Sequence, residues 1–356
     1  MPVGARLNDS ISARAWRLVG SLLSLMLLNS CGMGFLWHVS MGQLGLLTSQ
    51  QRVETVLCDG TLSEQDQQKL RLVLEVRQFA IDQLGLNADR SYTKFVDVGR
   101  PYVVYVLSAA AKDALEPYTW RFPIVGHAPY KGYFKEELAL REAKSLQEQG
   151  YDTYVRGARA YSTLGYFNDP ILSTMLSYHE FSLIDTIIHE LLHRTVWIDS
   201  SVSFNESFAN FVGAKGVNAY LTHRDGANAP SHQQYQDIQA DQAVFREYML
   251  DIVSQLEALY REPISRQAKL ERRETIFEAA RTHYPSVFPN MKTKTYQRYF
   301  EGRQLNNAVM LSFRRYNQDM SFFEDALAKH GGDLRRMIAA FKELRKEDLP
   351  VAFQTR

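Results

Sequence analysis

The chain of 356 residues lacks several features that would place it in a simple class. Its 41 basic and 40 acidic residues nearly cancel, so the composition gives no sign of a nucleic-acid partner and we expect none. The sequence contains no internal repeat and no low-complexity tract. It has only two cysteines, Cys31 and Cys58, and the first ends an N-terminal apolar segment. The chain beyond that segment then has no internal disulfide, and its stability must come from packing.

The N-terminus has the pattern of a secretory signal. An apolar segment, residues 18–28, follows three arginines, Arg6, Arg14 and Arg17. Leu28-Asn29-Ser30-Cys31 resembles a lipobox, which predicts that residues 1–30 are a lipoprotein signal peptide and that Cys31 is lipidated. We therefore expect a lipid-anchored membrane protein of the bacterial cell envelope that faces the periplasm or the exterior. The alternative is an uncleaved signal anchor, because apolar residues continue to Trp37.

A metal-binding motif lies near the middle of the chain. His189 and His193 are four residues apart, which on a helix places both imidazoles on one face where they can bind one Zn²⁺ ion. Glu190 lies between them, in the position of a general base. The segment has helical periodicity, with apolar residues at Leu183, Ile184, Ile187, Ile188, Leu191, Leu192 and Val196, and Ser182 resembles an N-cap. If two histidines and a glutamate are buried among these apolar residues, their polar atoms need bonding partners, and a bound metal ion would provide one for all of them.

Two downstream carboxylates are candidates for the third zinc ligand. Asp199 has the spacing of His-Glu-x-x-His-x-x-Gly-x-x-Asp families, but the glycine is a valine here. A helix that continued to Asp199 would turn its carboxylate about 240° away from His193. Glu206 lies in a second helical segment that Asn205 is expected to cap. This arrangement resembles the gluzincin metallopeptidases, which implies Glu206 as the ligand and Asn210 as a partner that orients a ligating histidine.

The chain as a whole resembles the bacterial "putative aminopeptidase" family of lipoprotein-like zinc peptidases. The matching segments cover nearly the whole mature chain: 84–86, 90–92, 99–102, 129–134, 161–167, 169–176, 189–193, 204–209, 305–308 and Tyr316. Two cysteines found in relatives correspond to Arg121 and His127, so a thiol or disulfide role there is absent. The resemblance supports a metallopeptidase more strongly than it supports exopeptidase specificity.

We expect an α+β fold of zincin type, with a small, partly antiparallel sheet beside the zinc helix and largely helical N- and C-terminal parts. The expected regions are a signal peptide (1–30), a lipid-anchored helical region (31–90), a zinc catalytic core (91–220) and a helical part packed on the core (221–356). Helices are predicted at 64–84, 135–149, 233–260, 266–282, 303–316 and 320–344. Strands are predicted at 102–107, 118–125, 151–155 and 160–165, the last two joined by a turn. In zincins, a strand just before the zinc helix receives the extended substrate backbone.

The predicted chemistry is zinc-assisted hydrolysis of peptide bonds. Zn²⁺ polarises the scissile carbonyl, and Glu190 takes a proton from water and passes it to the leaving amine. Tyr166 and Tyr316, both in segments shared with the family, are candidates for stabilising the oxyanion. We expect an aminopeptidase acting on short peptides. The alternatives are a membrane-tethered zinc endopeptidase that processes envelope proteins and a non-catalytic zinc-binding scaffold, for which Glu190 would have no use.

An aminopeptidase must also recognise the free ammonium group of its substrate, most directly with an acidic side chain. Four residues near the motif or after the 132–134 segment are candidates: Asp169, Glu180, Glu136 and Glu137. Their spacing identifies none of them, and each is interpreted more readily as a solvated surface residue. The oligomeric state does not follow from the sequence.

Overall fold

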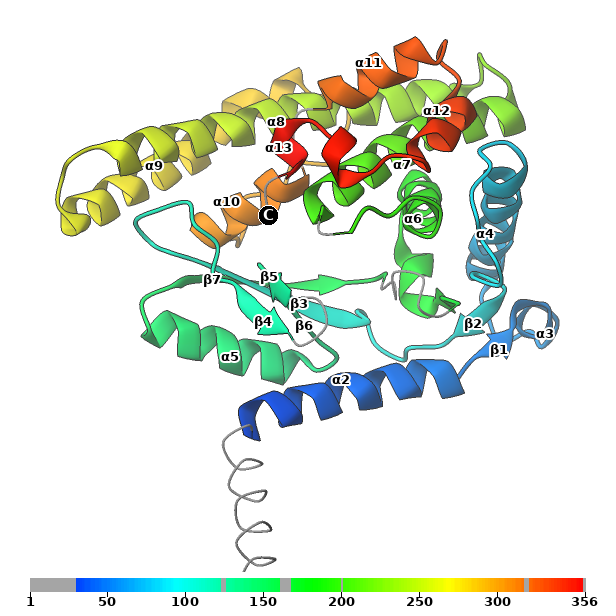
Figure 1. Cartoon of the computed structure of the whole chain (residues 1–356), viewed down its shortest axis with the longest axis horizontal. Helices are drawn as coiled ribbons and strands as arrows, with labels where there is room; N and C mark the ends of the chain where they lie inside the picture. Colours follow the sequence, from blue (N-terminus) through cyan, green and yellow to red (C-terminus); the bar gives the residue numbers. More distant parts are fainter. Residues whose placement is uncertain (1–29, 123–125, 161–167, 200, 317–319, 355–356) are drawn as a thin grey trace, which may run out of the picture. The chain divides into compact units, whose positions relative to one another are not determined.

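The computed structural model describes residues 30–122, 126–160, 168–199, 201–316 and 320–354 (Figure 1). The chain divides into two compact units, residues 1–49 and 50–356, and each is described by itself. In the first unit the described residues form helix α2 (Ser30–Thr48), which contains no acidic or basic residue except for a histidine. No helix among the described residues combines the length and the apolar character needed to span a membrane.

The second unit is mostly helical with short strands, so the fold is α+β, as predicted. Its helices are α3 (Val53–Cys58), α4 (Glu64–Asp82), α5 (Glu136–Glu148), α6 (Glu180–His193), α7 (Val202–Asp225), α8 (Pro230–Arg261), α9 (Arg266–Val287), α10 (Asn307–Tyr316), α11 (Ser321–Lys329), α12 (Leu334–Phe341) and α13 (Val351–Gln354). Short 3₁₀ helices are η1 (Ser173–Ser177), η2 (Phe288–Asn290) and η3 (Lys346–Asp348). The strands are β1 (Gln51–Arg52), β2 (Lys94–Val96), β3 (Val104–Ala110), β4 (Trp120–Phe122), β5 (Gly126–Ala128), β6 (Lys131–Tyr133), β7 (Asp152–Ala158) and β8 (Ile171–Leu172).

The described strands form three small sheets. Two are antiparallel, β6-β3-β7 and the pair β4-β5, while the third, β1-β2-β8, combines an antiparallel with a parallel pair. The predicted turn at 156–159 is wrong, because β7 continues to Ala158 and places Gly157 opposite Tyr105. A Cβ atom at Gly157 would lie 2.2 Å from the Tyr102 ring, so the glycine serves close ring packing within a strand. Most of the predicted strand at 160–165 lies outside the described residues.

Helices cover both faces of the β6-β3-β7 sheet, with α5 on one side and α10 on the other (Figure 1). A buried ion pair connects this sheet to the C-terminal helices. Arg273 on α9 donates to both carboxylate oxygens of Asp152, at 2.7 and 3.1 Å. The same carboxylate accepts the backbone N–H of Asn307, whose side chain donates to the carbonyl of Ala111 at 2.8 Å. These bonds fix the start of α10 against the sheet.

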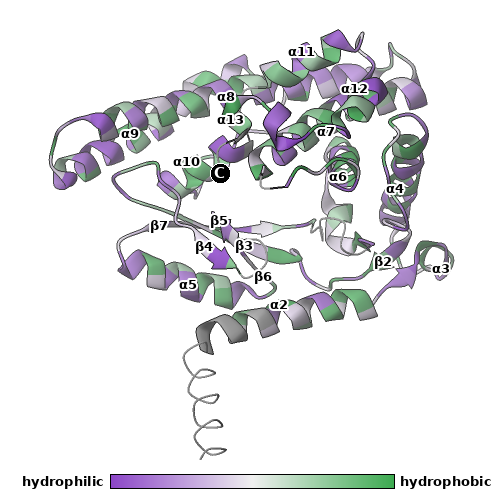
Figure 2. Cartoon of the chain, in the orientation of Figure 1, coloured by the Kyte–Doolittle hydropathy of each residue, from purple (hydrophilic) through white to green (hydrophobic). Residues whose placement is uncertain are grey.

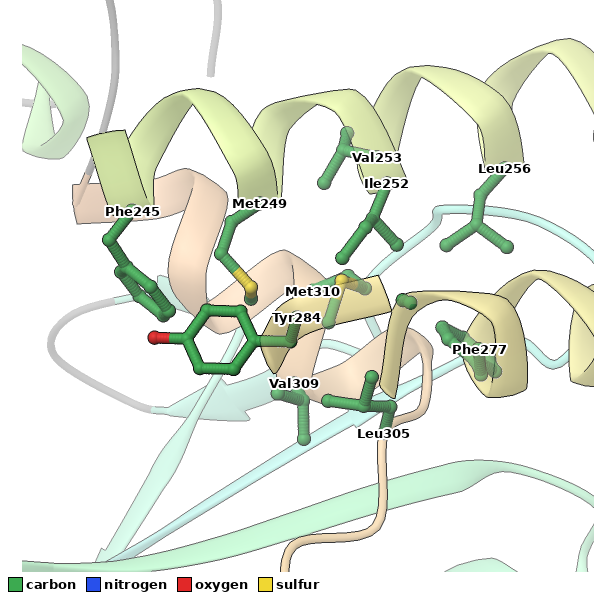
Figure 3. Close-up of a cluster of buried hydrophobic side chains, with 11 residues drawn as sticks. Phe245, Met249, Ile252, Val253, Leu256, Phe277, Tyr284, Leu305, Val309 and Met310 are labelled. Carbon is green, nitrogen blue, oxygen red and sulfur yellow. The ribbon is translucent and has the colours of Figure 1, made fainter. Parts of the chain in front are cut away.

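Helices α8, α9 and α10 share an apolar core. Figure 3 shows its side chains between the three helices: Phe245, Met249, Ile252, Val253, Leu256, Phe277, Tyr284, Leu305, Val309 and Met310. In Figure 2, hydrophobic and hydrophilic residues alternate along α8 and α9, as expected for helices with one buried face. The helix predicted at 320–344 is two helices, α11 and α12. They are separated at Gly331 and Gly332, whose φ angles of 69° and 78° are easily adopted only by glycine.

The metal-binding motif lies on α6, which packs closely against α7 and also against α4. Two fully buried phenylalanines on α7, Phe204 and Phe208, flank Glu206 in the sequence. The ring of Phe208 lies 5.5 Å from that of Phe323 and 4.7 Å from that of Phe341, and the ring of Phe204 lies 5.6 Å from that of Phe353. Burial of each such side chain stabilises the fold by about 1.5–3 kcal/mol. The last helices of the chain therefore hold the N-terminal end of α7.

Candidate metal centre

Helix α6 brings His189 and His193 onto one face and ends at His193. Its N-cap is His179, whose side chain accepts the N–H of Phe181, so the predicted cap at Ser182 is wrong. Ser182 is instead inside the first turn, where its carbonyl accepts a hydrogen bond from Thr186. The predicted helical character of the motif is confirmed, and the i, i+4 geometry applies.

Helix α7 positions the third member of the group, Glu206. This helix begins at Val202, so the predicted cap at Asn205 is also wrong. The buried Asn205 side chain instead accepts from the N–H and donates to the carbonyl of Ile198, both at 2.9 Å. These bonds close the connection between α6 and α7 directly beside Glu206.

The three side chains converge on one point. The Nε2 atoms of His189 and His193 lie 3.1 Å apart, and the Glu206 carboxylate oxygens lie 3.6 Å and 3.7 Å from them. Tetrahedral zinc with bonds near 2.1 Å places its ligand atoms about 3.4 Å from one another. The three side chains are mostly buried, with 14%, 3% and 18% of their surfaces exposed. The residues present therefore fit a metal ion held by two nitrogens and one oxygen.

The charges within the group are strongly coupled. Burial lowers the pKa of His189, but its hydrogen bond to Glu206 and the nearby carboxylates outweigh this and raise the pKa to about 9. Burial and the charge of His189 lower the pKa of His193 to about 4. Burial opposes ionisation of Glu206, but its bond to His189 and the neighbouring cations hold its pKa below the usual range. At neutral pH, His189 is therefore cationic and His193 neutral in the metal-free group.

Asp199 does not join this group. The premise that a helix would continue to Asp199 is wrong, because α6 ends at His193. The side chain of Asp199 is exposed nonetheless, and the group in the described residues that could hold a metal ion consists of His189, His193 and Glu206. Of the two carboxylates considered from the sequence, the structure brings Glu206 to the histidines.

Three residues that interact electrostatically with the group or with Glu190 were not identified from the sequence. The charge of Glu190 raises the pKa of two tyrosines, Tyr92 and Tyr178, in addition to the effect of their burial. The charge of Arg315 contributes to the lowered pKa of Glu206. Arg315 lies on α10 with its guanidinium 5.0 Å from the centre of the Tyr130 ring. Tyr92 and Tyr130 lie in segments that resemble the aminopeptidase family, and Arg315 directly precedes Tyr316, another residue of this resemblance. The resemblance could therefore have drawn attention to them.

The remaining predicted site residues have different outcomes. Tyr166 lies outside the described residues. Tyr316 is the last residue of α10 and Cys31 lies in α2, but the side chains of both also lie outside the described part of the chain. Asn210 is one turn beyond Glu206 on α7. Its Nδ2 atom is buried and has no hydrogen-bond partner in the described part of the chain.

The four candidate acidic residues for ammonium recognition lie in different environments. Glu136 and Glu137 are exposed at the start of α5, and Glu180 pairs with Arg224 at the start of α6. The surface interpretation of Asp169 is wrong, because only 3% of this residue is exposed. Its backbone carbonyl accepts the N–H of Tyr92 at 2.8 Å, which connects it to the loop beside the site.

A cavity of about 900 Å³ is lined mainly by residues of α6, α7 and α8, and none of the three candidate ligands is in its wall. Asp185 and Asn210 are in its wall, one helical turn from His189 and Glu206 respectively. Burial raises the pKa of Asp185 to about 6. A Cβ atom at Gly213 would lie 2.4 Å from the Oδ1 atom of Asp185. The absence of a side chain at Gly213 therefore makes room for the Asp185 carboxylate.

A family model described as "Putative aminopeptidase" matches residues 34–351. The chain belongs to this family. The match includes the whole metal-binding group and its neighbours Tyr92, Tyr178 and Arg315. Membership in the family indicates peptidase activity, and hence a peptide substrate. No curated protein and no solved structure matches the chain.

Proposed function

We propose that the protein is a zinc-dependent aminopeptidase of zincin type that acts on short peptides at the bacterial cell envelope. The observation that carries this proposal is the convergence of His189, His193 and Glu206 at 3.1–3.7 Å, with Glu190 adjacent on α6. Two nitrogens and one oxygen are a typical ligand set for catalytic zinc, which keeps a further coordination position open. Zinc bound there would supply Lewis acidity toward the carbonyl oxygen of the scissile bond.

The protein side chains have separate roles in this proposal. Glu190 accepts the proton of the attacking water and delivers it to the leaving amine. Tyr166 and Tyr316 are proposed donors to the oxyanion. Arg315, whose charge acts on Glu206, adds positive charge to the site. Asn210 is proposed to orient a ligating histidine.

The substrate ammonium group is proposed to lie in the cavity beside the group. Asp185 is in its wall, where the charge of His189 lowers its pKa against the larger effect of burial. Burial opposes ionisation of this carboxyl, and a substrate ammonium group beside it would favour the charged form. Asp185→Asn should therefore raise KM for peptides with a free N-terminus while zinc content stays unchanged.

The deciding experiment compares peptides of one sequence with free and acetylated N-termini, using zinc-loaded protein. We expect release of the first residue from the free peptide and no cleavage of the acetylated one. Glu190→Gln should keep its zinc and lose on the order of 10²–10⁴ in rate, the usual contribution of a general base. Cleavage of acetylated peptides at internal bonds would instead support a membrane-tethered endopeptidase. Stoichiometric zinc without hydrolysis of any peptide would support a zinc-binding scaffold.

The location is a separate part of the proposal. The lipobox-like Leu28-Asn29-Ser30-Cys31 supports a lipid anchor at Cys31, and the lack of acidic, lysine and arginine residues in α2 suits a segment close to a membrane. A fatty-acid probe should label the wild type but not Cys31→Ala. A mature protein that keeps residues 1–30 would be a signal-anchored protein instead.

A further inference from the structure

Helix α2 has an exposed apolar face. Trp37, Met41 and Leu44 are spaced by four and three residues, so they lie on one side of the helix. Their exposed fractions are 70%, 47% and 50%. Gly34 and Thr48 continue the same side toward the two ends of the helix and are also exposed. The exposed side of α2 is therefore apolar over most of its length.

The surroundings of this face in the sequence are free of charged side chains. Residues 18–51 contain no aspartate, glutamate, lysine or arginine. Every other helix of eight or more residues in the described part of the chain has at least one such side chain. Helices at the surface of a soluble protein usually place charged and polar residues on the side that meets water. A contiguous exposed apolar face instead marks contact with a membrane or with a protein partner.

The place of α2 in the chain favours a membrane over a protein partner. The lipobox-like segment ends at Cys31, the second residue of α2. An acyl anchor at Cys31 would hold the start of the helix at the bilayer surface. With a rise of 1.5 Å per residue, Trp37 lies about 9 Å and Leu44 about 20 Å along the helix from Cys31. The exposed face then starts close to the lipids, and the same holds if residues 1–30 are kept as a signal anchor.

The residue types on the face suit the boundary between lipid and water. Tryptophan is enriched at this boundary, because its ring is apolar while its N–H group can reach polar partners. Leucine and methionine add apolar surface on the same side of the helix. Helices that lie in the boundary bury their apolar face by roughly 5–10 Å. Such a contact also strengthens a lipid anchor, because stable attachment of a protein to a bilayer usually needs more than one signal.

We propose that α2 lies along the surface of a lipid bilayer and inserts Trp37, Met41 and Leu44 between the lipids. The inference rests on the proposed location at a membrane. It goes beyond a lipid anchor at Cys31, because it gives the chain a second, non-covalent contact with the bilayer. This contact fixes the direction in which the chain leaves the membrane, since α2 is held along its length and not only at one end.

Quenching of tryptophan fluorescence by brominated lipids tests the contact at Trp37. The purified full chain, processed as the cell produces it, is reconstituted with phosphatidylcholine vesicles that have bromine on the acyl chains. A Trp16→Phe background removes the tryptophan of residues 1–30. We expect quenching that disappears in Trp37→Phe and persists in Trp197→Phe, a matched control whose tryptophan is also exposed. Bromine near the headgroup should quench more than bromine near the end of the acyl chain, as insertion by roughly 5–10 Å requires.

A pair of leucine variants tests the rest of the face with the same measurement. Leu44 and Leu140, on α5, are 50% and 51% exposed. Leu44→Asp should lower the equilibrium constant for docking by about tenfold or more, seen as a loss of Trp37 quenching, because it removes buried apolar surface and adds a charge. Leu140→Asp should leave the quenching unchanged. Thermal unfolding without vesicles should be alike in the two variants, which shows that the fold is intact.

Several outcomes would overturn the proposal. They are the absence of quenching by brominated lipids, quenching that persists in Trp37→Phe, and equal losses in Leu44→Asp and Leu140→Asp. Protection of Trp37 from aqueous acrylamide without quenching by brominated lipids would also overturn it, and would point to a second copy of the chain on this face. Absence of the protein from cell membranes would contradict the proposed location. The quenching measurement would still decide the role of α2, because it uses purified protein with added vesicles.

Discussion

Zinc binding should release close to one proton, and this number should be nearly independent of pH between 5 and 6. In the metal-free group the pKa of His189 is about 9 and that of His193 about 4, so only His189 is charged in this range. Metal ligation requires both imidazoles to be neutral. From these pKa values we expect about 1.1 protons released per zinc at pH 5 and about 1.0 at pH 6. Two independent histidines of ordinary pKa would release about 1.9 and about 1.5.

The sign of the pH dependence follows from His189. Zinc binds only the neutral form of His189. Because the pKa of His189 is raised, the fraction of this neutral form falls about tenfold for each pH unit below 8, which weakens zinc binding by about 1.4 kcal/mol per unit. The apparent affinity should therefore rise about tenfold per unit from pH 5 to 8 and level off above pH 9. Isothermal titration calorimetry in buffers of different ionisation enthalpy gives both the proton count and the affinity. A count near 1.9 at pH 5 that falls to 1.5 at pH 6 would refute the prediction that only His189 is charged in this range.

Further predictions concern single residues of the site and its supports. Glu206→Ala should lose zinc and Asp199→Ala should keep it, as measured by metal analysis after dialysis; the opposite pattern would reverse the ligand assignment. Gly213→Ala would put a Cβ atom 2.4 Å from a carboxylate oxygen on α6, and we expect thermal unfolding to show destabilisation of about 1–3 kcal/mol. Arg273→Ala leaves a buried carboxylate unpaired and should cost about 3–5 kcal/mol in urea unfolding. Its neighbour Arg272 forms an exposed ion pair, so Arg272→Ala should change stability little, and equal losses would contradict this distinction.

The sequence predicted those parts of the site that depend on local spacing. His189 and His193 lie on one face because residues four apart on a helix point in the same direction. Glu206 could be predicted as the third ligand because a second helical segment follows shortly after the motif. The N-caps were predicted wrongly because tertiary contacts decide them. The side chain of Asn205 does not cap α7, because it forms two hydrogen bonds with the backbone of Ile198.

Other features could not be derived from local patterns. Tyr92 is distant in sequence from α6, and the loop that contains it is held by hydrogen bonds from several segments of the chain. The continuation of β7 through Gly157 depends on where the Tyr102 ring packs. The α+β composition and most long helices followed from periodicity, because a helix with one buried face repeats its apolar residues regularly.

The aromatic packing at the N-terminal end of α7 links the candidate metal-binding residues to segments far away in the sequence. Phe204, two residues before Glu206, packs against Phe341 and Phe353. A chain cut before residue 341 would therefore contain all three candidate ligands, while the helix that presents Glu206 lacked part of its support.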